Sequence, residues 1–254
     1  MQDGNDGGAV GAIATSRHQG FATAHAAESS RLLRTLPIDE YARLLPRLTP
    51  VRIRFKDVLV EPDAVIHDVY FPRTGVVSVI ADRQEDGAVE VATIGPEGLV
   101  GVPVLLGTDR IPYRCLVQVE GDAWRLSAET FRQLVDERPI LRRTLLRYTQ
   151  YLLDSVSQSV ACNRIHTLEE RAARWLLMTH DRVQGATFEL THEFLSQMLG
   201  VRRAGVTVAM GALQAAGIVR YMRGRLTVLD RPQLEEASCS CYAITRSALD
   251  RLLG

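Results

Sequence analysis

Apolar residues recur at intervals of three and four in two short segments near the end of the chain, which predicts two amphipathic helices. The apolar positions are Phe194, Leu195, Met198 and Leu199 in the first segment and Val206, Ala209, Met210 and Leu213 in the second. Thr191 is a good N-cap for the first helix, and Gly200 and Gly217 stand where glycine commonly ends a helix. Two short helices joined by a tight turn with glycine are the outline of a DNA-binding helix-turn-helix.

The segment after Gly217 predicts a β-hairpin. Ile218–Leu229 consists of two short β-like runs around Arg223, Gly224 and Arg225, which is typical of the wing of a winged helix. The whole chain has 254 residues and a formal net charge of zero, so its overall charge indicates no affinity for nucleic acid. Between residues 166 and 231, however, arginine exceeds the acidic residues by three, mostly in the turn and the wing. These are the places where contacts with DNA phosphates are needed.

The first half of the chain predicts a flexible tail, a short helical segment and then many strands. Residues 1–28 are rich in small and polar residues without periodicity, and residues 30–48 predict helix with a break at Pro37. Val51, Ile53 and Phe55 then alternate with basic residues, which predicts a half-buried strand. Further strands are expected at 65–71, 76–81, 89–94, 115–119 and 123–126, with an Asp-Gly hairpin signal at 86–87. This spacing favours a small antiparallel barrel or sandwich.

Helices are predicted again from Ser127, a candidate N-cap. Pro139 opens a long helix through about Arg164, and Thr167 with Glu170 forms a capping box for a further helix to about Thr179. Apolar residues of the long helix recur at intervals of three and four, as in a coiled-coil seam. They are Leu141, Leu145, Tyr148, Leu152, Val156 and Val160. This pattern favours pairing with a second copy, and the alternative is a helix packed only on its own domain.

The chemistry-bearing residues predict no enzyme and no cofactor. The four cysteines are irregularly spaced, and we expect a cytoplasmic protein with reduced thiols, no secretory signal and no membrane span. Cys239 and Cys241 form the one close pair, which leaves a redox switch, half of a metal site or two packed thiols as alternatives. Because no second pair supplies further ligands, no metal site is predicted. His166, His180 and His192 lie outside any metalloprotease pattern, and we find no catalytic set.

With these elements in order, the chain resembles the Crp/Fnr family of bacterial transcription regulators over about residues 30–230. The most specific matches are 190–213 and the preceding helix at 168–177, with weaker support from Gly75-Val76-Val77 and the glycine-rich segment 95–101. The resemblance implies an α+β fold with an antiparallel β-roll like the cyclic-nucleotide-binding domain, a long dimerisation helix and a winged helix-turn-helix. The implied divisions are a tail (1–28), a sensor roll (29–136), the dimerisation helix (137–165), the DNA-binding domain (166–231) and a helical extension (232–254).

The resemblance also implies which residues contact DNA. Arg203 matches the family's base-reading arginine, and Thr191 matches the cap residue that faces phosphate. The family often has glutamate where this chain has Ala204, and a second arginine where it has Val208, so base reading should differ. Arg202, Arg203 and Thr207 remain as candidate base readers. Arg223 and Arg225 are expected to contact phosphate together with Thr191.

The signal pocket departs further from the family pattern. Members that bind cyclic nucleotides carry Gly-Glu-Leu, and this chain has Gly101-Val102-Pro103. Tyr113 stands at the position of the phosphate-binding arginine, and Arg114 should point to the opposite face of its strand. We therefore expect an effector other than cAMP, or none, and assign Gly101, Val102, Tyr113 and Arg114 to a candidate effector pocket. No cysteine precedes Cys115, and His67 is the one histidine of the roll, which disfavours an iron–sulfur cluster and haem.

The expected partners are double-stranded DNA, a second copy of the chain and an unknown small-molecule effector, with RNA polymerase as a further candidate and no membrane. An alternative function is a small-molecule-binding module whose winged helix contacts proteins instead of DNA. A cupin-like metal oxygenase is disfavoured because that chemistry needs clustered histidines and carboxylates, and the roll has only His67.

Overall fold

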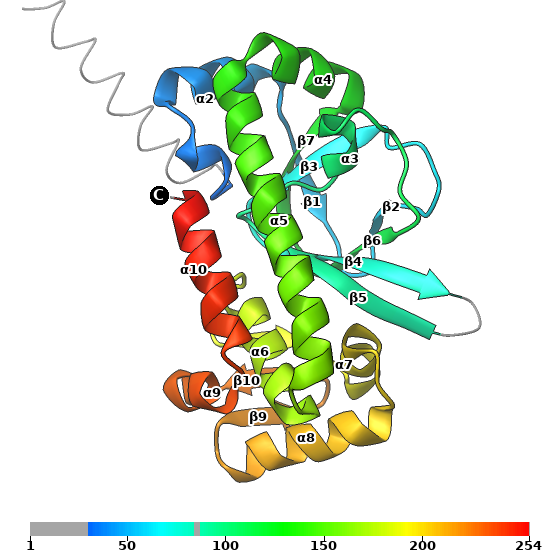
Figure 1. The fold of residues 1–254 in the computed structure, drawn as a ribbon, viewed down its shortest axis with the longest axis vertical. Coiled ribbons are helices and arrows are strands. Elements are labelled where there is room, and N and C mark those ends of the chain that lie inside the picture. The colour runs from blue at the N-terminus through cyan, green and yellow to red at the C-terminus, as the bar shows by residue number, and fades with distance from the viewer. Residues whose placement is uncertain (1–29, 84–86, 254) are drawn as a thin grey trace, which may run out of the picture.

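The computed structural model describes residues 30–83 and 87–253, so the tail predicted at 1–28 lies outside the described residues. A β-roll lies at one end of the molecule and a winged helix-turn-helix at the other (Figure 1). The long helix α5 (Pro139–Ile165) runs from the roll to the winged helix, and the C-terminal helix α10 (Cys241–Leu253) lies beside it. The predicted α+β architecture is confirmed.

The roll consists of two antiparallel sheets. One has the strand order β1-β7-β3 and the other β2-β6-β4-β5. The strands are β1 (Thr49–Ile53), β2 (Val58–Val60), β3 (Asp68–Pro72), β4 (Val76–Arg83), β5 (Gly87–Ile94), β6 (Arg114–Val119) and β7 (Gly121–Ser127). The five strands expected after β1 are all present with shifted ends, and β2 was not predicted, because three residues are too few for a visible alternation. The β4–β5 pairing of Arg83 with Gly87 agrees with the hairpin signal.

Two expectations near the start of the chain need correction. The segment predicted as helix is three short pieces, η1 (Leu33–Thr35), α2 (Ile38–Leu44) and η2 (Leu45–Arg47). Pro37 and Pro46 lack the backbone N–H that a continuous helix needs. Phe55 lies beyond the end of β1 with 39% of its surface exposed, so the half-buried pattern stops at Ile53.

Helix α4 (Ala128–Glu137) begins where Ser127 accepts a hydrogen bond from the Thr130 N–H, as its N-cap role predicts. Helix α5 follows directly after Arg138. Its residues Leu141, Leu145 and Tyr148 are buried in the core of the roll and Leu152 packs against it, so most of the predicted seam serves this domain. Val160, the last position of the predicted seam, is exposed, and Leu146 and Leu153 are exposed in the same row.

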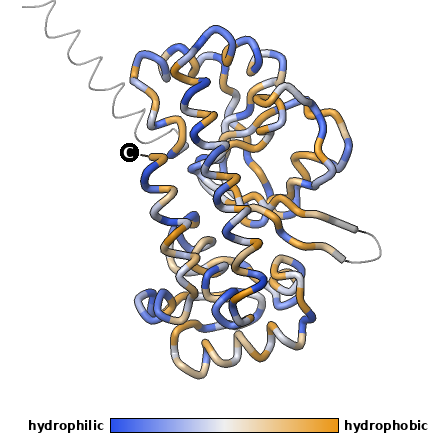
Figure 2. Tube along the Cα trace, viewed as in Figure 1, coloured by the Kyte–Doolittle hydropathy of each residue, from blue (hydrophilic) through white to orange (hydrophobic). Residues whose placement is uncertain are grey.

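The winged helix has its own core. Helix α6 (Leu168–His180) starts with the predicted capping box, and the strands β8, β9 and β10 form a small sheet against it. The other elements are α7 (His192–Leu199), α8 (Arg203–Ala215), β8 (Thr187–Glu189), β9 (Val219–Met222), β10 (Arg225–Val228) and α9 (Arg231–Ala237). The tube coloured by hydropathy shows mostly pale to orange colours along α8 (Figure 2). Helices α6, α7 and α8 each bury an apolar face in this core.

Helix α10 folds back along α5 and reaches the roll. Leu252 is buried in the core of the roll, and the guanidinium of Arg147 on α5 donates to the carbonyl of Arg251 at 2.8 Å. Helix α10 therefore links the winged helix to the roll. Among residues 30–83 and 87–253, none of the helices is long and apolar enough to cross a membrane.

Buried polar contacts join the roll to α6 of the winged helix. Arg182, just after α6, places both Nε and Nη2 at 2.7 Å from Glu97 Oε1 of the roll, and the two side chains are 4% and 1% exposed. Burial lowers the pKa of Arg182, but the Glu97 charge offsets this and the pKa is raised overall. Trp175 Nε1 also donates to Glu90 Oε2 at 2.6 Å, so the two domains are held by specific hydrogen bonds as well as apolar contact.

Candidate functional site

Helix α8 presents one face to solvent at the end of the molecule opposite the roll (Figure 1). Its inner face is buried through Val206, Met210 and Leu213. The exposed face begins with Arg203 at the first helical position and continues with small or apolar residues, including Val208, which is 75% exposed. Arg203 and Thr207 are the candidate base readers that this exposed face carries.

The first helix of the motif is fixed by its cap. Thr191 Oγ1 accepts a hydrogen bond from the Phe194 N–H at 3.0 Å, and Gly200 ends the helix with a φ of 63°. A left-handed residue at this position lets the chain turn sharply into α8. The predicted helix-turn-helix is therefore confirmed at both its cap and its turn.

His192 lies between the two helices and the wing, and sequence reasoning did not assign it there. Its ring stacks on Tyr221 of β9 with 4.5 Å between ring centroids, and its Nδ1 lies 3.1 Å from Thr207 Oγ1 of α8. Burial and the nearby Arg203 charge lower the pKa of His192. The His192 side chain thus connects the N-terminus of α7 with Thr207, a candidate base reader, and with the wing. In the sequence, the one feature that could have indicated this role is its position directly after the N-cap Thr191.

The wing has the tight turn that its sequence predicts. Arg223 and Gly224 have φ values of 53° and 78°, and positive φ at both central residues is the type I′ geometry that suits a two-residue hairpin. The structure brings the three candidate phosphate contacts together, because Thr191, Arg223 and Arg225 line one surface hollow of about 280 Å³. Phe55 of the roll, which is 39% exposed, lines the same hollow.

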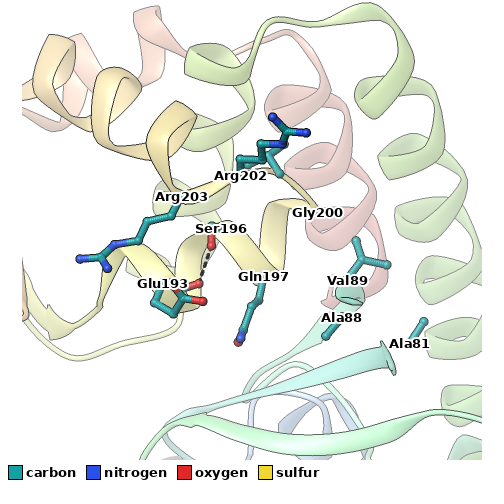
Figure 3. Close-up of a pocket in the computed structure, with 10 residues that line it drawn as sticks. Ala81, Ala88, Val89, Glu193, Ser196, Gln197, Gly200, Arg202 and Arg203 are labelled. Carbon is teal, nitrogen blue, oxygen red and sulfur yellow. Dashed lines mark hydrogen bonds between the residues drawn. The ribbon is translucent and has the colours of Figure 1, made fainter. Parts of the chain in front are cut away.

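A larger cleft, of about 900 Å³, separates the helix-turn-helix from the β4–β5 hairpin of the roll (Figure 3). Arg202 and Arg203 lie on its winged-helix side, and Ala81, Ala88 and Val89 lie on its roll side. The hairpin approaches the motif closely at Gly200, where an added Cβ would stand 3.0 Å from Val89 Cγ2. The candidate base-reading residues therefore border directly on the roll.

The roll contains an apolar cavity of about 290 Å³ next to α5. It is lined by Val79, Val91, Ala92, Ile94, Leu99, Gly101, Val102, Pro103, Leu106, Ile111, Tyr113, Cys115, Leu152 and Val156. Three of the four predicted pocket residues, Gly101, Val102 and Tyr113, are among them. Arg114, the fourth, is not one of the described lining residues, and its Nε lies 3.5 Å from Glu61 Oε2. Alternation along β6 turns Arg114 away from the cavity that its neighbours Tyr113 and Cys115 line.

Gly101 has a structural role at the cavity. Its φ of 104° is unfavourable for any residue with a side chain, and an added Cβ would lie 2.8 Å from Val69 Cγ1. Helix α3 (Val102–Leu105) starts directly after it. The glycine at the start of the predicted pocket is thus required by backbone geometry.

Comparison with known proteins identifies both halves of the chain. Residues 50–138 match the model of the cyclic nucleotide-binding domain, and residues 170–237 match the model of the Crp-like helix-turn-helix domain. Together the two models cover more than half of the chain. No curated protein sequence matches.

Solved structures share this fold over about three quarters of the chain. FixK2 from Bradyrhizobium japonicum is 17% identical with a TM-score of 0.64, over 76% of this chain and 98% of that one. The c-di-GMP responsive global regulator CLP from Xanthomonas campestris is 16% identical with a TM-score of 0.61, over 76% and 99%. TTHA1359, a CRP/FNR family transcriptional regulator from Thermus thermophilus, is 21% identical with a TM-score of 0.59, over 75% and 98%. The last two are described as regulators.

A cyclic-nucleotide-binding type of roll, a long connecting helix and a Crp-like helix-turn-helix follow one another here in the order found in those regulators. The chain belongs to the Crp/Fnr family of DNA-binding transcriptional regulators.

Proposed function

We propose that this regulator acts as a homodimer on a palindromic DNA site and responds to an uncharged signal in its roll. The observation that carries the DNA-binding part is the exposed face of α8, which starts at Arg203 and lies next to strand β9 of the wing. Two such faces about 34 Å apart would fit two successive major grooves on one side of the duplex.

The dimer is supported by the exposed row on α5. Leu146, Leu153 and Val160 are spaced by seven residues and are 44%, 57% and 67% exposed. A seven-residue apolar repeat on an exposed helix face is the pattern of a coiled-coil seam. Pairing α5 with the same helix of a second copy would bury this row and fix the separation of the two α8 helices.

Arg203 is the proposed main base reader, with Arg202 and Thr207 beside it. Arginine can donate two hydrogen bonds to guanine in the major groove, which discriminates against other bases by about 1–3 kcal/mol. Thr207 also lies within reach of His192, so its hydroxyl has a defined position. Thr191, Arg223 and Arg225 share one hollow and would contact the phosphates, which orients α8 without reading sequence.

The chemistry of the cavity supports a signal other than a cyclic nucleotide. Among the described residues that line it, Tyr113 has the one polar side chain apart from the Cys115 thiol, and none is charged. Burial raises the pKa of that thiol to about 12, so it is neutral as well. A phosphate placed there would lose its hydration without gaining an ionic partner, which is strongly unfavourable. An apolar molecule of modest size fits the lining better.

The test is selection of bound duplexes from a random DNA pool at about 150 mM salt, where binding through charge alone is weakened. We expect enrichment of a palindrome whose half-sites are one helical turn apart. Arg203→Ala should relax the preference at one base pair per half-site, and Arg132→Ala, which removes an exposed arginine from α4 of the roll, is the charge-matched control. Absence of any enriched sequence, both with and without an extract of cell metabolites, would favour a winged helix that contacts proteins.

A further inference from the structure

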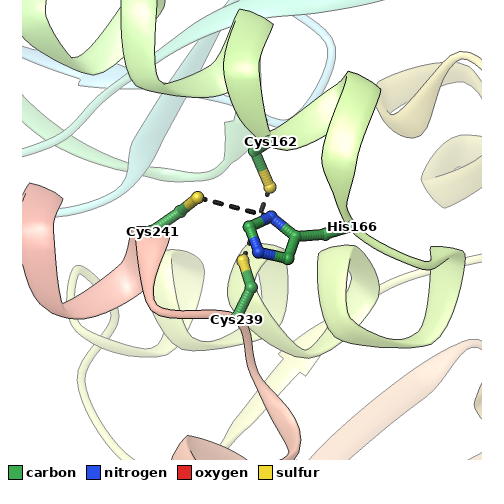
Figure 4. Close-up of side chains that lie close together, drawn as sticks. All are labelled: Cys162, His166, Cys239 and Cys241. Atoms are coloured by element: carbon green, nitrogen blue, oxygen red, sulfur yellow. Dashed lines mark hydrogen bonds between the residues drawn. The ribbon is translucent and has the colours of Figure 1, made fainter.

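Four metal-binding side chains meet where the long helix joins the winged helix (Figure 4). Cys162 and His166 lie one turn apart at the end of α5. Cys239 lies between α9 and α10, and Cys241 is the first residue of α10. In the sequence only Cys239 and Cys241 lie close together, and no further ligands were expected for them. Folding supplies these ligands, because it brings the end of α5 to the start of α10 across more than seventy residues.

The four ligand atoms are close enough to share one ion. They all lie within 4.8 Å of one another, with 3.5 Å between the sulfurs of Cys162 and Cys239 and 3.5 Å between Cys241 Sγ and His166 Nδ1. Zinc–sulfur and zinc–nitrogen bonds of about 2.3 and 2.1 Å place the ligand atoms of a tetrahedron roughly 3.5–3.8 Å apart. Small side-chain rotations therefore suffice to bring all four ligand atoms to coordination distance from one ion.

We propose that Cys162, His166, Cys239 and Cys241 bind one Zn²⁺ ion in a tetrahedral structural site. Three thiolates and one imidazole complete the coordination, so no position is left for water or substrate, which is the mark of a structural zinc site. Soft thiolate ligands select zinc over magnesium or calcium. An iron–sulfur cluster would need ligand atoms farther apart, on separate irons.

Proton and charge balance are consistent with this occupant. Binding Zn²⁺ releases three thiol protons to solvent and leaves a site with one net negative charge. Gln158 Nε2 donates to Cys241 Sγ at 3.0 Å, and the positively charged Arg174 is close enough to Cys162 to interact with it electrostatically. Such neighbours stabilise thiolates and fix their orientation.

The surroundings also allow the ion to enter. The three cysteines form a buried cluster, at 0%, 4% and 2% exposure, while His166 is only half-buried. Cys239 also lines a surface hollow with Pro232, Glu235 and Arg246. The site is therefore sheltered from water and reachable from one side.

The place of the site gives it a consequence for the whole molecule. His166 is the C-cap of α5, and the next residue, Thr167, is the N-cap of α6. A bound ion would fasten this junction to the segment that leads into α10, which itself reaches the roll through Leu252. Loss of the ion should free the winged helix to move relative to α5.

The experiment uses the full-length protein, without an affinity tag, purified under reducing conditions. We expect about one zinc per chain by elemental analysis, and cobalt reconstitution should give the visible absorption of tetrahedral Co²⁺ with thiolate charge-transfer bands. Cys241→Ala and His166→Ala should each lose most of the bound zinc and change the cobalt spectrum. Cys115→Ala also removes one cysteine and should keep full zinc, because Cys115 lies in the roll.

The wild-type measurement keeps the proposal falsifiable even if a variant fails to fold. Fully reduced wild-type protein that takes up neither zinc nor cobalt would overturn it. So would protein isolated without metal whose unreduced mass is lower by two hydrogens and whose peptides join Cys162 to Cys239, since that result identifies a disulfide. Equal zinc loss in Cys115→Ala and Cys241→Ala would show that the metal is not held by this cluster.

Discussion

The buried ion pair between Glu97 and Arg182 should make the largest single electrostatic contribution to holding the roll on the winged helix. Glu97 Oε1 accepts from both Nε and Nη2 of Arg182 at 2.7 Å and from the Gly95 N–H at 3.1 Å. Arg182 Nη1 also donates to the Met178 carbonyl at 2.6 Å. Water cannot replace either partner, because both side chains are almost fully buried.

Removal of one partner leaves the other charge buried, which costs about 3–5 kcal/mol. We therefore expect Glu97→Gln and Arg182→Met each to lower the free energy of unfolding or of domain separation by that amount. The double variant should lose much less than the sum, since replacement of a buried pair by neutral groups is often close to neutral.

The assay is urea unfolding followed by tryptophan fluorescence and by circular dichroism. Trp175 is a suitable reporter because its Nε1 donates across the same interface to Glu90. Arg52→Met is the matched control, since Arg52 pairs with Glu120 on the surface with 51% and 58% of the side chains exposed, and such pairs contribute little. Single variants that behave like this control, or a double variant whose loss equals the sum, would refute the reasoning.

Three further predictions concern DNA, the dimer and pH. Arg223→Ala should weaken binding to all duplexes about equally and reduce the salt slope by about one, and a changed sequence preference would make the wing a base reader. Leu153→Glu places a charge in the proposed seam and should yield monomers in sedimentation velocity, whereas an unchanged mass would locate the dimer elsewhere. Burial raises the pKa of the Glu90 carboxyl. Its contribution to the free energy of unfolding is therefore complete below pH 4.5 and is lost as the pH rises through the higher pKa of the folded state. In Glu90→Gln the urea midpoint should fall less steeply with rising pH than in the wild-type protein. Parallel curves of midpoint against pH for the two proteins would contradict this prediction.

The sequence by itself determined the features that depend on neighbours a few residues apart. The capping box of Thr167, the cap of Thr191 and the left-handed turn at Gly200 all appear where the sequence predicts them. The same holds for the tight turn at Arg223. Capping, helical periodicity and turn geometry depend on local backbone and side-chain chemistry, which is why one sequence suffices to find them.

Tertiary structure alone decided which distant residues meet. It pairs Glu97 with Arg182, removes Arg114 from the cavity and brings Cys162 and His166 to Cys239 and Cys241. It also decides that part of the apolar surface of α5 packs on the roll while Leu153 stays exposed. Periodicity shows that a helix has apolar positions but not which neighbour covers each one. That choice follows from how the two cores pack against α5 and α6, and these contacts join segments far apart in the chain.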